Sequence, residues 1–179
     1  MFRKNNRWKV LQVFFDDPLP DGIGFQLREI SRKMKISPSS VKRYLKELEK
    51  EKLIISVKHR IHGYPVYYAN RDAEIFKWMK KIDITLRIRE SGLLDYLLHC
   101  CMPEVIILFG SAARGEDIRE SDIDIYLQCK KEELNIGRYE AILKRKINPL
   151  FSADLNKLSN ELKNNILNGM IMKGYIKVF

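Results

Sequence analysis

Residues 106–111 read IILFGS and, after an interval of ten residues, residues 122–127 read DIDIYL. The first segment is an apolar run ending in glycine and serine, which predicts a buried strand and a tight turn whose N–H groups and hydroxyl can face a phosphate. The second alternates acidic with apolar residues, so Asp122 and Asp124 are expected on one face of a strand. Because adjacent carboxylates repel each other, a divalent cation between them is favourable. Together the segments predict a site for a nucleoside triphosphate with its metal ion.

This arrangement resembles the minimal nucleotidyltransferases of the DNA polymerase beta-like superfamily, which share an apolar-Gly-Ser turn followed by Asp-apolar-Asp. The resemblance extends from about residue 103 to the C-terminus. It implies that Gly110 allows close approach of the backbone and that Ser111 binds the β- and γ-phosphates of an NTP, with ATP as the expected nucleotide. It also implies that Asp122 and Asp124 are Mg²⁺ ligands and, with Ser111, the catalytic residues.

Arg114 lies in the short helix expected after this turn and, by the same resemblance, is a candidate nucleotide-binding residue. A second interpretation pairs its guanidinium with Glu116, Asp117 or Asp122, and the sequence leaves both interpretations open. Ser121, just before the acidic pair, is expected to tighten the loop rather than to react.

The resemblance also implies a third carboxylate, on a later strand, that takes the proton from the attacking hydroxyl. The strand expected to carry it is 147–151, after a helix around 138–146, and the residue at the corresponding position is Asn148. An amide cannot act as a general base at neutral pH. Asp154 is the nearest acid and is expected in a loop or a helix cap. The sequence therefore leaves open whether the chain is an enzyme.

The basic charge is confined to the first half of the chain. The 179 residues carry a formal net charge of +10. Residues 1–90 hold 21 Lys and Arg against 11 Asp and Glu, whereas residues 91–179 hold 12 of each. This asymmetry predicts two domains with different tasks, the first facing a polyanion such as double-stranded DNA.

The first half has the order of elements of a small DNA-binding domain. Apolar spacing predicts helices at 8–15 and 25–34, and a serine–proline pair at 37–38 is a strong start signal for a third helix. Segments 54–58 and 66–69 predict a hairpin with a basic tip. This order resembles a winged helix-turn-helix, which implies that the third helix enters the major groove and the hairpin contacts the DNA backbone. The DNA-binding residues that it implies are Ser39, Ser40, Lys42, Arg43 and Lys46 on the helix and Lys58, His59 and Arg60 on the wing.

Two alternatives stand beside DNA binding. The lysines of this half could simply solvate a small helical domain, or the winged helix could contact a protein. Because Lys and Arg supply mainly salt-sensitive affinity, no operator sequence can be derived from them.

The predicted fold class is α+β. A winged helix-turn-helix domain is expected at 1–71, connecting helices at 72–102, and a minimal nucleotidyltransferase domain with a mixed β-sheet flanked by helices at 103–179. The last part of the chain is expected to form an amphipathic helix at 155–167 and an apolar strand or docking segment at 170–179.

The composition predicts a cytoplasmic protein without membrane contact. No apolar run approaches the roughly 20 residues that span a bilayer, and no apolar signal core follows the charged N-terminus. Cys100, Cys101 and Cys129 lack metal-ligand spacing, and we expect them to be buried as small apolar residues in a reducing compartment.

Two functions are compatible with these features. The first is a DNA-associated enzyme that transfers a nucleoside monophosphate from NTP–Mg²⁺ to a hydroxyl on a protein, a nucleotide or a small molecule. One acceptor that the resemblance suggests is a helical partner toxin of the HEPN type. The second is a winged-helix transcription regulator whose nucleotidyltransferase domain is catalytically degenerate and at most binds nucleotide. Asn148 favours the second, and the Gly-Ser turn with its paired aspartates favours the first. A homodimer is a further expectation, because winged helices often bind paired half-sites.

Overall fold

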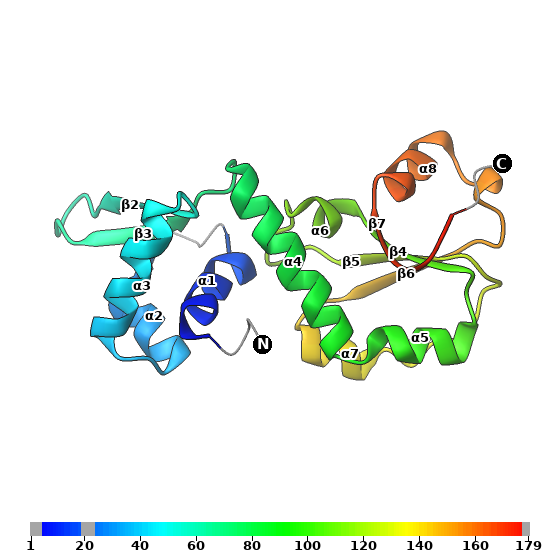
Figure 1. Ribbon diagram of the computed structural model, residues 1–179, viewed down its shortest axis with the longest axis horizontal. Coiled ribbons are helices and arrows are strands. Elements are labelled where there is room, and N and C mark those ends of the chain that lie inside the picture. Colours follow the sequence, from blue (N-terminus) through cyan, green and yellow to red (C-terminus); the bar gives the residue numbers. More distant parts are fainter. Residues whose placement is uncertain (1–4, 19–23, 177–179) are drawn as a thin grey trace. The chain divides into compact units, whose positions relative to one another are not determined.

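The computed structural model describes residues 5–18 and 24–176, and the chain divides into two compact units, 1–80 and 81–179 (Figure 1). Each unit combines helices with one sheet, so the α+β class predicted from the sequence is confirmed. The division falls inside α4 (Glu74–Glu90), the first of two helices in the predicted connecting segment. The units are described in turn.

The N-terminal unit has the predicted order of three helices and a hairpin. Its three strands pair antiparallel in the order β1-β3-β2. At the start of the third helix, the Ser37 hydroxyl accepts a hydrogen bond from the Ser40 N–H and Pro38 holds the first helical position, as predicted. The elements are α1 (Asn6–Asp16), β1 (Phe25–Gln26), α2 (Leu27–Met34), α3 (Pro38–Lys50), β2 (Ile54–Lys58) and β3 (Pro65–Ala69).

The predicted start of the second helix, residue 25, is wrong by two positions. Phe25 and Gln26 form β1 instead, because they pair with Tyr67 and Val66 of β3. Gln26 then acts as the N-cap of α2 in a capping box with Glu29. Pairing with a distant strand thus overrides a locally helical apolar pattern.

The C-terminal unit is built on a mixed sheet. Its strand order is β6-β5-β4-β7, in which β5 and β6 are parallel and the other pairs are antiparallel. β6 is an edge strand, which accommodates Pro149. After α4 the elements are α5 (Leu93–Cys101), β4 (Val105–Phe109), α6 (Gly110–Arg114), β5 (Ile123–Leu127), α7 (Gly137–Leu143), β6 (Ile147–Phe151), the 3₁₀ turn η2 (Leu155–Lys157), α8 (Asn160–Leu167) and β7 (Met170–Gly174).

The two faces of this sheet are covered unequally. One face packs Ile106, Leu108 and Ile125 against α5, α6, α7 and the last turns of α4. The opposite face packs Phe109 and Tyr126 against α8. Figure 1 shows α5 and α7 on one side of the sheet and α8 on the other. Since side chains alternate along a strand, Asp124 shares the face of Tyr126; Asp122, which was expected on the same strand, lies one residue before it.

Three further expectations need correction. The helix predicted at 155–167 is interrupted, because Ser159 caps a new helix and leaves a 3₁₀ turn before it. The helix predicted at 138–146 ends at residue 143, where Lys144 adopts a left-handed conformation with φ of 56°. Cys101 is buried and Cys129 half-buried, but Cys100 is exposed at the end of α5.

The strand predicted at 170–179 forms over 170–174, and residues 177–179 lie outside the described part of the chain. Over the described residues, no helix combines the length and the apolar character needed to cross a bilayer.

Candidate functional site

The turn between β4 and α6 places glycine against the second aspartate. Gly110 has a φ of +72°, a left-handed value that favours glycine. A Cβ at this position would lie 2.4 Å from Oδ2 of Asp124. The side chain of Asp124 therefore occupies the space that any other residue at position 110 would need. The structure brings the predicted Gly-Ser turn and one of the predicted metal ligands together.

Asp124 lies between two neighbouring strands. It stands opposite Phe109 in the antiparallel pairing with β4 and opposite Asn148 in the parallel pairing with β6. The Nδ2 of Asn148 donates a hydrogen bond to Oδ1 of Asp124 at 3.0 Å. A carboxylate only accepts, so the amide must present its NH₂ group here. Asn148 is thus beside the acidic pair, as predicted, and it contributes a donor where a base would be needed.

Asp154 lies at the other end of the sheet. Its carboxylate caps the 3₁₀ turn by accepting a hydrogen bond from the Asn156 N–H. Ser152, two residues before Asp154, donates its N–H to the carbonyl of Leu127, which lies three residues along β5 from Asp124. Three residues of strand span about 10 Å. Asp154 therefore cannot replace the missing carboxylate.

At this end of the sheet the buried Tyr126 has a raised pKa. Tyr126 is buried and donates its hydroxyl to the carbonyl of Ser152. Burial, followed by the nearby charge of Asp154, raises the pKa of Tyr126 to about 12. The charge of Asp154 therefore acts on Tyr126, in the core of the sheet.

Asp122 lies one residue before β5, on the loop that follows α6. Its side chain is exposed, and within the described residues no hydrogen bond to its carboxylate is formed. Its main chain is held by Arg145, whose guanidinium donates to the carbonyls of Ser121 and Asp122 and pairs with Asp117. Sequence reasoning did not find Arg145, because no local pattern links it to a loop more than 20 residues away.

The hydroxyl of Ser121 accepts the N–H of Ile118 at 2.9 Å, so it tightens the loop as predicted. Ser111 is half-buried in the first turn of α6, and no described residue forms a hydrogen bond with its hydroxyl. That hydroxyl can therefore meet a ligand, as its predicted role requires.

Of the two interpretations of Arg114, the structure shows the ion pair. Its Nε lies 2.8 Å from Oε2 of Glu116, with both side chains roughly half exposed. An exposed pair of this kind contributes at most about 1 kcal/mol. A phosphate could compete for the guanidinium at small cost, so the predicted role in nucleotide binding stays a prediction.

The donor set at this site suits one kind of metal complex. Asp122 and Asp124 are the two carboxylates, and the described residues contain no group of three or more His, Cys, Asp or Glu side chains able to hold a metal. Mg²⁺ is usually bound by one or two carboxylates together with water and substrate phosphates, rather than by a cage made of protein alone. The two aspartates therefore fit Mg²⁺ that arrives with a nucleoside triphosphate.

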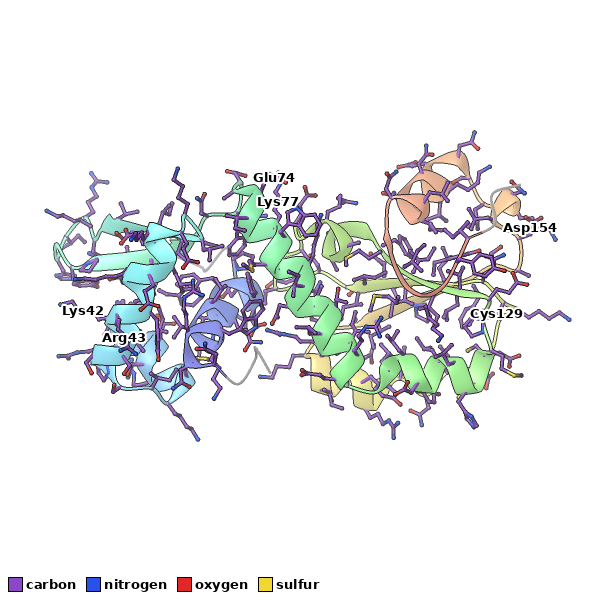
Figure 2. All side chains as sticks on the ribbon, in the orientation of Figure 1. Lys42, Arg43, Glu74, Lys77, Cys129 and Asp154 are labelled. Carbon is purple, nitrogen blue, oxygen red and sulfur yellow. The ribbon has the colours of Figure 1, made fainter. Side chains whose placement is uncertain are left out.

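The residues predicted to bind DNA lie on one helix and one hairpin. Figure 2 shows Lys42 and Arg43 on α3. The Arg43 guanidinium rests over the ring of Tyr44 at 5.0 Å. The hydroxyls of Ser39 and Ser40 both contact Ser37, so part of their capacity serves the helix cap. The predicted residues that are exposed are Ser39, Lys42, Arg43, Lys46, Lys58 and Arg60, while Ser40 and His59 are partly buried.

The wing contains a stack of aromatic rings that the sequence analysis did not predict. The rings of His59, His62 and Tyr64 stack on one another with centroids 4.8–5.7 Å apart. The Nδ1 of His59 accepts the N–H groups of Ile61 and His62 and so closes the turn. These contacts hold the basic tip in a defined shape.

Comparison with known protein families gives two matches, in the order predicted. Residues 26–55 match the family described as winged helix-turn-helix DNA-binding, and residues 93–176 match the family described as polymerase beta, nucleotidyltransferase. The first match covers α2 and α3, and the second runs from α5 to β7. No curated protein and no solved structure matches the chain.

Proposed function

We propose that this chain, a winged helix-turn-helix followed by a nucleotidyltransferase-fold domain, binds DNA and takes NTP–Mg²⁺ as a regulatory ligand. The observation that carries the proposal is the hydrogen bond from Asn148 to Asp124. The amide stands at the position where the family resemblance calls for a general base. The site keeps the groups for binding and lacks the group that would start transfer.

Binding is supported by the residues around the Gly-Ser turn. Asp122 and Asp124 would hold Mg²⁺, which neutralises charge on the triphosphate. Ser111 would donate its hydroxyl to a phosphate, and Arg114 would exchange its exposed pairing with Glu116 for a phosphate oxygen. Gly110 leaves room for the Asp124 carboxylate beside the turn. ATP is the nucleotide to test first.

Transfer of a nucleoside monophosphate would require a general base in addition to the groups that bind the nucleotide. An acceptor hydroxyl must lose its proton while its oxygen bonds to the α-phosphorus and pyrophosphate leaves. A positioned general base contributes about 10²–10⁴-fold to such a step. Asn148 cannot take the proton, because its amide has no basic site near neutral pH. Asp154 lies too far along the sheet.

A second candidate function is transfer of a nucleoside monophosphate to a hydroxyl on a partner. The paired aspartates next to the Gly-Ser turn favour it, since they are the groups that transfer itself uses. A HEPN-type partner, a homodimer and a role in transcription remain predictions that follow from the resemblance, and a cytoplasmic location remains a prediction from the composition.

One experiment separates the two functions. Full-length protein is titrated with ATP and Mg²⁺ by calorimetry, and in parallel is incubated with ATP labelled at the α-phosphate, Mg²⁺ and cell lysate. Regulation predicts saturable binding that Asp124→Asn weakens, a change in DNA affinity with nucleotide, and no labelled product. A labelled product that disappears in Asp124→Asn would establish the transferase instead. Absence of binding by the wild type would refute both.

A further inference from the structure

Arg145 holds the backbone of the acidic site, although within the described residues its guanidinium forms no hydrogen bond with the carboxylate of Asp122 or Asp124. Its side chain is only 12% exposed, and it lies between α7 and β6. We infer that Arg145 is a positioning residue that aims Asp122 at the metal–nucleotide complex, an inference that rests on the proposed function.

The three contacts of Arg145 converge on the loop between α6 and β5. Its Nη1 pairs with Oδ2 of Asp117, a carboxylate that is 3% exposed. Its Nε donates to the carbonyl of Ser121 at 2.7 Å, and its Nη2 donates to the carbonyl of Asp122 at 3.1 Å. The ion pair with Asp117 holds the guanidinium in place, and the other two donors hydrogen-bond the main chain of the loop.

The two carbonyls lie on either side of the Asp122 Cα atom. The Ser121 carbonyl precedes that atom, and the Asp122 carbonyl follows it. Holding both restricts rotation of the two adjoining peptide planes, and so sets the direction of the Cα–Cβ bond. Within the described residues the Asp122 carboxylate makes no hydrogen bond, so its aim depends on this backbone constraint.

Arginine is suited to this task in a way that lysine is not. A guanidinium presents five N–H donors in a rigid plane and stays charged at every physiological pH. A lysine could keep the ion pair with Asp117 but could not reproduce the planar arrangement of donors to two successive carbonyls. The hydrogen bonds between Ser121 and Ile118 lie upstream of Asp122 and do not act on its Cα–Cβ bond.

Arg145 also belongs to the segment that carries Asn148. The next residue, Lys146, accepts the Ile123 N–H with its carbonyl at 2.8 Å, which starts the pairing of β5 with β6. One short stretch of chain therefore sets both Asp122, through Arg145, and the amide beside Asp124. Variation in this stretch is expected to alter the spacing of the two aspartates.

The test is a double-mutant cycle with ATP–Mg²⁺ as the probe. Affinities are measured by calorimetry for the full-length wild type, Arg145→Lys, Asp122→Asn and the double variant, at a temperature where circular dichroism shows each to be folded. Arg145→Lys should weaken binding about five- to twentyfold, and should have no further effect when Asp122 is already asparagine. Arg138→Lys is the matched control, because the Arg138 guanidinium packs on Tyr139 and, within the described residues, forms no hydrogen bond with this loop.

Unchanged affinity in Arg145→Lys, or an equal loss in the Asp122→Asn background, would overturn the inference while leaving the proposed function intact. Failure of the wild type to bind ATP–Mg²⁺ would overturn both. If Arg145→Lys does not fold, Asp117→Asn removes the charge that anchors the Arg145 guanidinium while keeping the shape of the side chain. This variant should weaken binding about two- to threefold, and wild-type affinity would again refute the inference.

Discussion

Replacement of Gly110 by alanine tests the central geometry of the candidate site. The substitution places a Cβ 2.4 Å from Oδ2 of Asp124, closer than real Cβ atoms approach any heavy atom. It also forces alanine into a left-handed conformation, since φ is +72°. The Asp124 side chain must rotate away, and its hydrogen bond with Asn148 is then lost.

The chain offers a matched control at Gly92. This glycine has a φ of +79° and nothing within 4 Å of its would-be Cβ, so alanine there incurs the backbone cost alone. That cost is about 1–2 kcal/mol. Gly110→Ala adds the loss of one charge-assisted hydrogen bond, about 1 kcal/mol at a partly exposed site. We expect the free energy of unfolding to fall by about 2–3 kcal/mol in Gly110→Ala and by about 1–2 kcal/mol in Gly92→Ala.

Gly110→Ala and Gly92→Ala should differ more in their affinity for ATP–Mg²⁺ than in stability. Displacing one of two carboxylate ligands should weaken ATP–Mg²⁺ at least tenfold, by analogy with the effect of disturbed metal surroundings. At a ligand concentration 100 times the wild-type Kd, ATP–Mg²⁺ stabilises by about 2.7 kcal/mol, and a tenfold weaker variant gains only about 1.4 kcal/mol. Urea denaturation with and without ATP–Mg²⁺ measures both quantities. Equal stabilisation of Gly110→Ala and Gly92→Ala would refute the placement of the metal beside the turn.

Three more predictions follow from particular contacts. Asn148→Asp puts a second carboxylate 3 Å from Asp124, so without metal it should lower the free energy of unfolding by about 1 kcal/mol. In the α-phosphate labelling assay it should give labelled product at about 100 times the wild-type background or more, and no gain would show that more than the base is missing. Arg43→Ala with Lys46→Ala should weaken DNA binding and reduce its salt slope by about 1 for each phosphate contact removed, as filter binding at several salt concentrations would show; an unchanged slope would rule out docking by α3. Burial raises the pKa of Tyr126 from 10 to about 12. The contribution of the protonated tyrosine to the free energy of unfolding is therefore complete below pH 10 and is lost as the pH rises to 12. This loss should be about 2–3 kcal/mol and absent in Tyr126→Phe, and a wild-type tyrosinate absorbance that titrated entirely at pH 10 would contradict it.

Local patterns were sufficient to predict several features of the candidate site. The alternation of Asp124 with two isoleucines predicted that Asp124 lies on the face opposite to theirs, because side chains alternate along a strand whatever surrounds it. The turn at Gly110 and the helix start at Ser37 were predicted for similar reasons, since each depends on backbone conformation within a few residues. The uneven charge of the two halves is a property of composition alone, and it predicted two domains, of which the basic one carries the winged helix-turn-helix match.

Tertiary structure decided what these residues meet. The contact between Asn148 and Asp124 depends on the register of two parallel strands, and the position of Asp154 depends on which end of the sheet its loop follows. The Arg145 contacts join residues 23–28 positions apart, and the pairing of Phe25 with β3 overrode a helical pattern. Pairings of this kind are selected by the packing of the whole sheet rather than by neighbours in the chain. The sequence by itself therefore indicated which residues could form a nucleotide site, and only the folded chain decided that Asn148 donates a hydrogen bond to Asp124 and that Arg145 holds the loop of Asp122.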